Sequence, residues 1–460
     1  MNVPSFTQDE LIKITRGRLL KEGRSSFFKG VTIDSRCVKK GSIFLAIKGV
    51  NQDGHDFIDE AVKKGAAAII VSKEIRGLEN ICIILVNDTT RALGALGATH
   101  RLKFNYPVIA ITGSAGKTTT KELIFSVLSI KYRVLKNKGS FNNHWGVPLT
   151  LLSMDDSYSA AVLELGTNNP GEIRYLTGLV RPEIVVLTNI GPCHLKGLKT
   201  VRDVYREKRS ILDGLKSSGG VVFNNDDRFL RHLKRLKKFR NRSFGFKAGA
   251  EFIADEIEMS RNGTLSFRVN KHHKMKLRSP VRENISNALA AVVCGRLFNI
   301  SFDDIRKGLF RYPFNQHRQE IERFSGLTVI NDSYNANPIS FRSAISTLIS
   351  FPCKGRKVLV CGDMLELGRE SVNLHGQLAE AVPLGEVDII FSYGPLMKHF
   401  VRKVNKLYPG VRTGSFQDME QLKKVLVKTV SRRDVILVKG SRGMKMERCL
   451  DCLKEKFQRS

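Results

Sequence analysis

The 460-residue sequence contains no apolar run long enough to span a bilayer. Its first residues, MNVPSFTQDELIKITRG, also lack the apolar core of a signal peptide. We therefore expect a chain with no membrane span that stays in the cytoplasm. An apolar fraction of 42% is still enough for sizeable cores, and the length predicts two or three domains.

Cysteine is sparse, with eight residues scattered along the chain and mostly set in apolar segments such as 81–83 and 359–361. This pattern is typical of reduced core thiols and not of a disulfide framework. Cys449 and Cys452 form a lone CxxC, and the pair Cys353 and Cys361 lacks metal-ligand spacing. We interpret both pairs as structural.

Acidic residues are few: 44 Asp and Glu stand against 76 Lys and Arg, which gives a net charge of +32. Such a balance favours contact with polyanions and leaves a nucleic-acid-dependent NTPase as an alternative. However, the basic residues are spread along the whole chain. Their densest run, 228–242, has leucines and phenylalanines at helix-like spacing and predicts an amphipathic helix. We therefore expect no dedicated nucleic-acid partner; anionic substrates or a general shift of composition explain the charge more simply.

Apolar strand patterns and helical patterns alternate in three regions, which we predict to be α/β domains at 1–104, 105–312 and 313–460. The first is small. The middle region predicts a parallel, doubly wound sheet that binds ligands at the carboxyl ends of its strands. Its polar segment 251–278 predicts an antiparallel appendage, and the last region predicts a smaller Rossmann-like domain. The strands expected in the first two regions are 30–34, 42–47, 67–71, 81–86, 108–112, 160–164, 184–188 and 220–224.

The most informative segment is 106–121, YPVIAITGSAGKTTTK, in which an apolar strand turns through glycines into a helix start. Such a turn directs several backbone N–H groups, and the positive end of the helix, toward one anion. Lys117 adds a mobile charge, and Thr118 offers a hydroxyl to Mg²⁺. The segment predicts a nucleoside triphosphate cradle, although Ile111 stands where a strict P-loop has its first glycine. The alternative is an ordinary strand-to-helix turn.

Further polar residues follow other predicted strands. Glu164 ends one strand, where it could meet an Mg²⁺ held by Thr118; the alternative is a surface or helix-capping glutamate. His194 lies in a loop shaped by glycine and proline. Lys208, by contrast, is one lysine among many on a predicted solvated helix, and nothing in the local pattern singles it out.

The last region repeats this arrangement. Asp332 and Tyr334 follow a strand in a loop fixed by Pro338, and their density of donors and acceptors suits nucleotide binding. Arg318, upstream, could reach a terminal phosphate from another domain. The segments 362–368 and 439–443 end two more strands with glycine-flanked polar groups that could grip a carboxylate or phosphate.

Taken together, these segments resemble the Mur ligase superfamily, the ATP-dependent amide-bond formers of peptidoglycan precursor synthesis. The resemblance covers nearly the whole chain and is strongest to the MurF-type branch, which adds D-alanyl-D-alanine to the UDP-N-acetylmuramoyl-tripeptide. The Asp-Asn-Pro-Arg motif of the branch that adds diaminopimelate or lysine is not found here. The segments that carry the resemblance are TGSAGKTTTK at 112–121, SFNNHWGVPLTLL at 140–152, ELGTNNPGEI at 164–173, TNIGPCHL at 188–195, NDSYNANPIS at 331–340 and CGDMLELG at 361–368.

The resemblance implies roles that the residues alone do not. Lys117, Lys208, His194 and Arg318 are the implied catalytic residues, with Lys208 N-carbamylated so that it presents an anionic oxygen to Mg²⁺. Glu283 stands where the family often has histidine, one turn before the implied adenine contact Asn287. The full implied set is Gly113, Ser114, Ala115, Gly116, Lys117, Thr118, Thr119, Asn287, Arg318, Asp332 and Tyr334 for ATP; Thr118, Glu164, His194 and Lys208 for Mg²⁺; Ser35, Arg36, Lys48, Asp53 and His55 for the UDP-sugar; and Asn142, Asn143, Thr167 and Asn168 for the muramoyl-peptide.

The activity implied by the resemblance is ATP-dependent ligation through an acyl phosphate by a chain that acts as a monomer on small-molecule substrates. Another ligase of the superfamily, such as a folylpolyglutamate synthetase or the diaminopimelate-adding branch, is the nearest alternative. A noncatalytic, ATP-gated scaffold is a third reading. The amine acceptor decides among the ligases.

Overall fold

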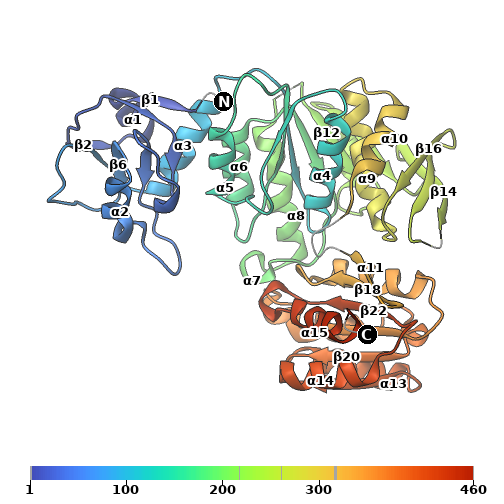
Figure 1. Ribbon diagram of the computed structural model, residues 1–460. Helices are drawn as coiled ribbons and strands as arrows, with labels where there is room; N and C mark the ends of the chain where they lie inside the picture. Colours follow the sequence, from blue (N-terminus) through green and yellow to red (C-terminus); the bar gives the residue numbers. More distant parts are fainter. Residues whose placement is uncertain (1–2, 217, 261, 315–318, 459–460) are drawn as a thin grey trace.

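The computed structural model describes residues 3–216, 218–260, 262–314 and 319–458, which form three layered α/β domains in chain order (Figure 1). The three domains and their α/β architecture agree with the expectation from the sequence. No helix among the described residues is long and apolar enough to cross a membrane.

The first domain holds a five-stranded sheet in the order β2-β7-β6-β5-β4, in which only β2 is antiparallel. The four strands expected from the sequence here are confirmed as β4 to β7. The small strands and the first helix carry little hydrophobic signal and escaped prediction. The elements are β1 (Ser5–Thr7), α1 (Gln8–Thr15), β2 (Arg18–Lys21), β3 (Phe27–Lys29), β4 (Val31–Thr32), β5 (Ile43–Leu45), α2 (Ile58–Lys63), β6 (Ala68–Val71), β7 (Cys82–Leu85) and α3 (Thr89–Arg101).

The middle domain is built on a nine-stranded sheet in the order β16-β15-β14-β13-β12-β11-β8-β10-β9. Its strands from β9 to β14 are parallel, as expected. They are β8 (Val108–Thr112), β9 (Val134–Lys136), β10 (Ala160–Glu164), β11 (Ile184–Leu187), β12 (Gly220–Asn224), β13 (Arg240–Gly245), β14 (Phe252–Met259), β15 (Leu265–Val269) and β16 (His273–Leu277).

Helices cover both faces of this sheet, which explains why β8 reads as an unbroken apolar run. Ile109 and Ile111 face α4 and α9, whereas Val108 and Ala110 face α5, α6 and α8. The helices are α4 (Lys117–Leu128), α5 (Gly146–Leu152), α6 (Glu172–Val180), α7 (Leu195–Leu198), α8 (Val201–Arg209), α9 (Glu283–Leu297) and α10 (Phe302–Arg311).

One expectation is confirmed and one is wrong beyond β12. The segment 251–278 contains the antiparallel strands β14, β15 and β16, as predicted. The basic run 228–242 is not an amphipathic helix: it forms a short 3-10 turn, Arg231–Arg235, and the start of β13. Leu230 and Leu233, which gave the helical spacing, are buried under a single turn before the chain joins the sheet.

The third domain has a six-stranded sheet in the order β17-β18-β22-β19-β20-β21, in which only β17 is antiparallel. One face packs on α11, α12 and α13, and the other packs on α14 and α15. The elements are β17 (Glu320–Phe324), β18 (Leu327–Asp332), α11 (Pro338–Ser350), β19 (Lys357–Gly362), α12 (Ser371–Gln377), β20 (Ile389–Tyr393), α13 (Met397–Leu407), β21 (Arg412–Phe416), α14 (Met419–Thr429), β22 (Val435–Lys439) and α15 (Glu447–Gln458).

The third domain is docked against the end of the middle domain, with α7 and α11 both at the junction (Figure 1). Asn337 Nδ2 donates to the carbonyl of Ser114 over 3.2 Å. A Cβ on Gly191 would lie 2.1 Å from Ile339 Cδ1, so a larger residue here would displace the Ile339 side chain. The carboxyl ends of β8 and β18 therefore face one another across the domain junction.

Candidate nucleotide-binding site

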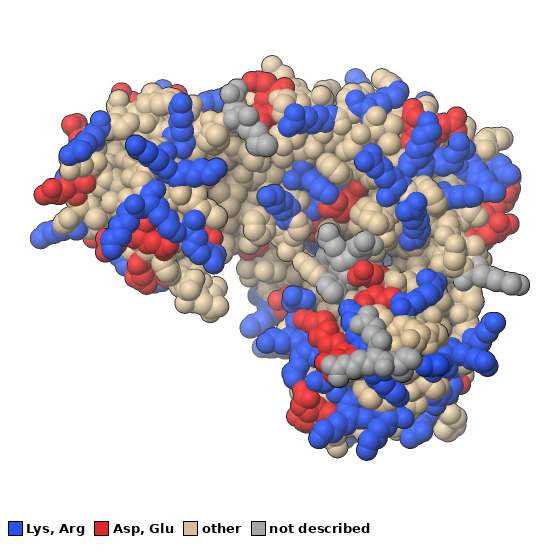
Figure 2. Space-filling model, viewed as in Figure 1, with Lys and Arg blue, Asp and Glu red and all other residues tan. Residues whose placement is uncertain are grey.

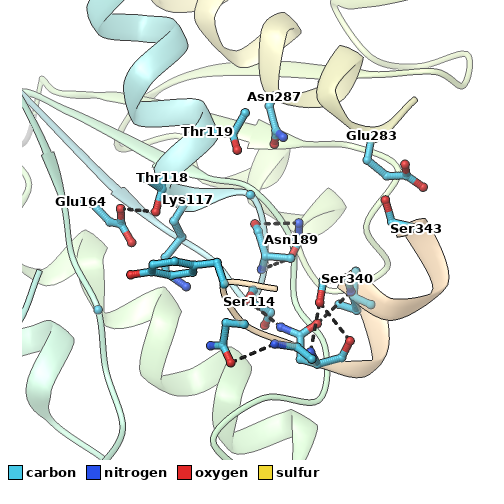
Figure 3. A pocket seen from close by; sticks show the side chains of 18 of the residues that line it. Ser114, Lys117, Thr118, Thr119, Glu164, Asn189, Glu283, Asn287, Ser340 and Ser343 are labelled. Atoms are coloured by element: carbon cyan, nitrogen blue, oxygen red, sulfur yellow. Dashed lines mark hydrogen bonds between the residues drawn. The ribbon is translucent and has the colours of Figure 1, made fainter. Parts of the chain in front are cut away.

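A cavity of about 550 Å³ lies at this junction, with walls from the middle and third domains (Figure 3). Most of the candidate residues named from the sequence lie around this one space. The candidates that line it are Ser114, Ala115, Gly116, Lys117, Thr118, Thr119, Asn142, Asn143, Glu164, Thr167, Asn168, His194, Asn287, Asp332 and Tyr334.

The turn from β8 into α4 depends on its two glycines. Gly116 has a φ of +78°, and a Cβ there would lie 2.4 Å from Asn287 Oδ1. A Cβ on Gly113 would lie 1.9 Å from Thr188 Oγ1. Larger residues would push away the neighbouring walls, so the glycines keep the turn tight against the rest of the site.

Asn189, a residue that the sequence analysis missed, holds this turn. Its carbonyl accepts from the Ser114 N–H over 2.9 Å, and its Oδ1 accepts from the Ala115 N–H over 2.8 Å. Its Nδ2 donates to the Ala115 carbonyl over 3.1 Å. These two N–H groups therefore already have partners within the protein. The N–H groups left to hold an anion are those of the first turn of α4, which have no intrahelical partner. The position of Asn189 just past β11 was the available signal.

Lys117, Thr118 and Glu164 lie close together in the cavity wall (Figure 3). Lys117 Nζ donates to the Gly113 carbonyl over 2.9 Å, so the side chain folds back over the turn. Thr118 Oγ1 donates to Glu164 Oε2 over 2.8 Å, and Glu164 Oε1 accepts from Asn142 Nδ2 over 2.8 Å. Because β8 and β10 are adjacent parallel strands, their carboxyl ends bring this hydroxyl and this carboxylate together.

This pair has the oxygen chemistry that Mg²⁺ prefers. No group of three His, Cys, Asp or Glu side chains suited to a metal occurs in the part of the chain that the structure describes. A magnesium ion here would therefore take its remaining ligands from substrate phosphates and water, as is usual for this ion.

Lys208 is fully buried on α8, behind the cavity wall. Its Nζ has no hydrogen-bond partner among the described residues. The pKa of Lys208 is lowered to about 8, chiefly by burial. Cys193 opposes this shift, Lys117 adds to it, and Glu207 and Glu164 oppose it. The lysine that looked solvated in the sequence is thus an isolated interior amine close to the centre of the site.

Glu207, the preceding residue, was also missed. Its Oε2 accepts from the Gly171 N–H over 2.7 Å, and its Oε1 accepts from the Ile173 N–H over 2.7 Å. Thr167 Oγ1 donates to the same carboxylate over 3.2 Å. A buried carboxylate therefore caps α6 and fixes the loop that carries Thr167 and Asn168.

The third domain contributes Asp332 and Tyr334 from the loop after β18. Asp332 Oδ2 lies 2.6 Å from the buried Lys439 Nζ, and Lys439 also lines the cavity. His194 reaches the same space from the middle domain, with its Nδ1 3.0 Å from Glu366 Oε2 of the third domain. Arg318 lies outside the described residues.

Asn287 reaches the site from α9. It accepts from Thr120 Oγ1 over 3.1 Å and donates to Asn284 Oδ1 over 3.0 Å. These bonds fix the amide against the turn at Gly116, so its position in the cavity wall is set by both α4 and α9.

The first-domain candidates do not line this cavity. Ser35 Oγ donates to Glu60 over 2.6 Å, Arg36 forms a two-pronged pair with Asp34, and Lys48 forms a backbone bridge with Asp53. The N–H groups of His55 hold the pKa of Asp53 well below its usual value, and His55 Nε2 accepts from the Ser72 N–H. These residues follow β4 and β5, and they lie apart from the nucleotide cavity.

A second cavity of about 450 Å³ adjoins the first and leads toward α3 of the first domain. Both cavities share Asn143, His144, Gly166 and Glu172. Asn143 Oδ1 caps α5 by accepting from the Gly146 N–H over 2.9 Å. Figure 2 shows Lys and Arg over all three domains of this face, so the positive charge is not confined to one patch.

Family models for a Mur ligase catalytic domain, a Mur ligase middle domain and a Mur ligase glutamate ligase domain match residues 28–101, 111–295 and 317–442. The chain belongs to the Mur ligase family. It is 33% identical over 444 residues to the UDP-N-acetylmuramoyl-tripeptide–D-alanyl-D-alanine ligase of Bacillus subtilis strain 168, with 96% of each chain covered.

Solved Mur ligases have the same architecture. A crystal structure of MurF from Acinetobacter baumannii matches with a TM-score of 0.90 and 31% identity, covering 99% of this chain and all of that one. MurF from Thermotoga maritima in complex with ADP matches with a TM-score of 0.83 and 29% identity, covering 93% and 98%. The expected MurF-type membership of the Mur ligase family is confirmed.

Proposed function

We propose that this chain is an ATP-dependent Mur ligase that joins D-alanyl-D-alanine to the UDP-N-acetylmuramoyl-tripeptide and yields the pentapeptide, ADP and phosphate. One observation carries the proposal: a single cavity joins a phosphate-binding turn to the polar loops of the third domain, in a chain of MurF type. ATP and nucleotide-linked peptides are made in the cytoplasm, so the reaction belongs there. The working unit in this proposal is a monomer.

The nucleotide is bound by the first turn of α4, Lys117 and Thr119, with Asn287 toward the base and Asp332, Tyr334 and Arg318 from the third domain. The helix N-terminus and the lysine favour negative charge at this point. The phosphate end of ATP therefore lies over the β8–α4 turn, beside Thr118 and Glu164.

Thr118, Glu164 and His194 are the proposed protein ligands of Mg²⁺. The 2.8 Å contact between Thr118 and Glu164 brings a hydroxyl and a carboxylate together, which suits a cation that also contacts phosphates. When bound, Mg²⁺ neutralises charge on the transferring phosphoryl group.

Lys208 fits N-carbamylation. A neutral amine is needed to attack CO₂, and a pKa of about 8 makes that form accessible near neutral pH. The orphaned Nζ gains hydrogen-bond acceptors and a negative charge when it is modified, and an anionic oxygen near Glu164 suits Mg²⁺ better than an ammonium does.

The reaction proposed for this site has two steps. The terminal carboxylate of the tripeptide attacks the γ-phosphorus of ATP, and the bond from that phosphorus to the β-phosphate oxygen breaks. The products of this step are an acyl phosphate and ADP. The neutral amine of D-alanyl-D-alanine then attacks the acyl carbon, phosphate departs, and the amine proton passes to solvent or phosphate. Lys117 and Arg318 stabilise the charge that develops on the phosphoryl group, and docking of the third domain keeps water out.

The acid substrate spans the first and middle domains in this proposal. Ser35, Arg36, Lys48, Asp53 and His55 bind the UDP-sugar, and Asn142, Asn143, Thr167 and Asn168 bind the muramoyl-peptide. The second cavity supports this path because it links α3 of the first domain to the nucleotide site. We place the domain boundaries at 104/105 and 312/313, between the three sheets.

An acceptor screen tests the function. Phosphate release is measured with ATP, UDP-N-acetylmuramoyl-tripeptide and one amine at a time: D-alanyl-D-alanine, diaminopimelate, lysine or glutamate. We expect turnover only with D-alanyl-D-alanine. Equal turnover with another amine would contradict the assignment, and ATP hydrolysis stimulated by RNA at physiological salt would favour a nucleic-acid-dependent NTPase instead.

A further inference from the structure

The loop at 363–368 of the third domain presents Glu366 to the middle domain. The Asp363 carboxylate anchors the loop by accepting from the Met397 N–H over 2.7 Å. The Met364 N–H donates to His375 Nε2 over 2.9 Å, and the Leu365 N–H donates to Ser441 Oγ over 2.8 Å. Three consecutive residues are thus held from three different parts of the third domain, which fixes the backbone that leads to Glu366.

Glu366 contacts the middle domain through both its backbone and its side chain. Its carbonyl accepts from the Lys196 N–H over 3.2 Å, and its Oε2 lies 3.0 Å from His194 Nδ1. A Cβ on Gly368 would lie 3.3 Å from the Leu195 carbonyl, so the loop lies directly against α7. The contact at His194 is therefore part of the domain junction.

Both partners have left-handed backbone conformations, with φ of +51° at His194 and +64° at Glu366. Residues other than glycine adopt this region at a cost and remain there only where surrounding contacts enforce it. The surrounding contacts therefore hold both residues of this pair in defined backbone conformations.

We propose that Glu366 is a positioning residue, which orients the His194 imidazole for the magnesium–triphosphate end of the site only when the third domain is docked. The inference rests on the proposed function. Nδ1 is engaged by the carboxylate, so Nε2 is the ring nitrogen left for a ligand, and no residue among those described hydrogen-bonds to it. A carboxylate on the far nitrogen fixes both the tautomer and the ring orientation of a ligating histidine. Completion of the site is thereby coupled to domain docking.

The test uses the full-length enzyme with Glu366→Ala, Glu366→Gln, His194→Ala and the double variant Glu366→Ala/His194→Ala. Glu370→Gln is the matched control, since Glu370 lies in the same loop region and bonds only Asn373 among the described residues. We expect Glu366→Ala to lower kcat 10- to 100-fold, with little change in KM for the UDP-tripeptide. The kcat of Glu366→Gln should stay much closer to that of the wild type. The double variant should be no slower than His194→Ala alone.

A second measurement does not depend on turnover. The affinity for Mn²⁺ is measured by electron paramagnetic resonance in the presence of a nonhydrolysable ATP analogue. We expect about 10-fold weaker binding in Glu366→Ala and none of this loss in Glu370→Gln. Additive losses in the double variant, or unchanged Mn²⁺ affinity in Glu366→Ala, would overturn the proposal. If the wild type binds Mn²⁺ and the analogue but ligates no peptide, the proposed function fails while the role of Glu366 is still decided by the binding data.

Discussion

Lys439 Nζ lies 2.6 Å from Asp332 Oδ2, at the carboxyl ends of two paired strands, β22 and β18. The lysine is fully buried and also donates to the Asn335 carbonyl over 3.2 Å. The sequence suggested Asp332 for ATP binding and the segment at 439–443 for gripping an anion. The structure joins the two into one buried ion pair in the wall of the cavity.

The first prediction concerns this pair. Lys439→Met removes the buried ammonium that lies against the Asp332 carboxylate, so we expect the free energy of unfolding to fall by about 3–5 kcal/mol in urea titrations. The double variant Asp332→Asn/Lys439→Met should recover most of that loss, because the buried charge is gone. If the double variant is as unstable as Lys439→Met, the ion pair is not what stabilises this wall.

Lys117→Ala tests the phosphate-binding turn. Because Lys117 contacts only the Gly113 carbonyl among the described residues, we expect little change in the urea midpoint. Phosphate release in the ligation assay should fall by about 10²–10³-fold, the loss typical of removing a charge that stabilises the transition state. Lys131→Ala, an exposed lysine just past the same helix, is the control and should behave as the wild type. A wild-type rate in Lys117→Ala would favour the scaffold reading.

The variant Lys208→Met should change stability and activity in opposite directions. The pKa of Lys208 is lowered on folding, so the folded protein disfavours its charged form, and that penalty is present at pH 7 and is relieved only as pH rises from about 8 toward 10.5. In buffer free of bicarbonate, the variant should therefore be more stable than the wild type at pH 7, by roughly 1–3 kcal/mol. Ligation should be nearly abolished.

Lys208→Ala adds a rescue experiment. The smaller side chain leaves room in the wall, so short carboxylic acids should restore part of the activity by supplying the missing carboxylate. ¹³C-bicarbonate should give a carbamate signal in the wild type and none in the variant. Full activity of Lys208→Ala without any added acid would exclude the carbamate role.

Asn189→Ala removes the side-chain contacts that hold the turn at Ala115. We expect KM for ATP to rise about 10-fold and the free energy of unfolding to fall by about 1–2 kcal/mol, since the Ala115 N–H would lose its partner. Asn169→Ala, in which an exposed bond to Glu172 is lost, serves as the control. An unchanged KM for ATP would show that the turn keeps its shape without Asn189.

Acid should destabilise the protein through His375. Burial lowers the pKa of this imidazole, and its Nε2 must stay unprotonated to accept from the Met364 N–H. The unfolded chain binds the proton more readily, so the stabilisation is complete above about pH 6.5 and is lost as pH falls through that value toward the folded pKa. We expect His375→Gln to reduce the slope of unfolding free energy between pH 6.5 and 5, by at most about 1.4 kcal/mol per pH unit. An unchanged slope would mean that another group, such as the buried His100, dominates.

The sequence predicts those parts of the fold that depend on patterns of neighbouring residues. The strand Val108–Thr112 and the turn after it were predicted to the residue, because an apolar run buried on both faces and a glycine-rich turn are both local patterns. The helix predicted for the run 228–242 was wrong, because three leucines at helical spacing fit a single 3-10 turn as well as a helix. The CxxC prediction is compatible with α15, where Cys449 and Cys452 are buried thiols.

The candidate site likewise contains residues that the sequence could predict and residues that it could not. Thr118 and Glu164 could be paired in advance, since adjacent parallel strands end side by side. Lys208 could not, because its burial comes from packing between distant elements; only the family resemblance singled it out. Asn189, Glu207 and Glu366 act by holding other residues, and a role of that kind has no signature in a single sequence.

Because of helix α3, the two domain junctions should differ in rigidity. Gly94 on this helix lets the Tyr175 ring approach so closely that any Cβ would lie 2.0 Å from its hydroxyl, and Trp145 Nε1 donates to Thr90 Oγ1 over 3.2 Å. Whole helices thus pack the first domain against the middle one, whereas the third domain meets the middle one through α7, the start of α11 and the loops beside them. The first and middle domains should therefore move as one rigid body relative to the third. Distances between α3 and α6 should stay constant, while the distance between Asn337 and Ser114 should fluctuate.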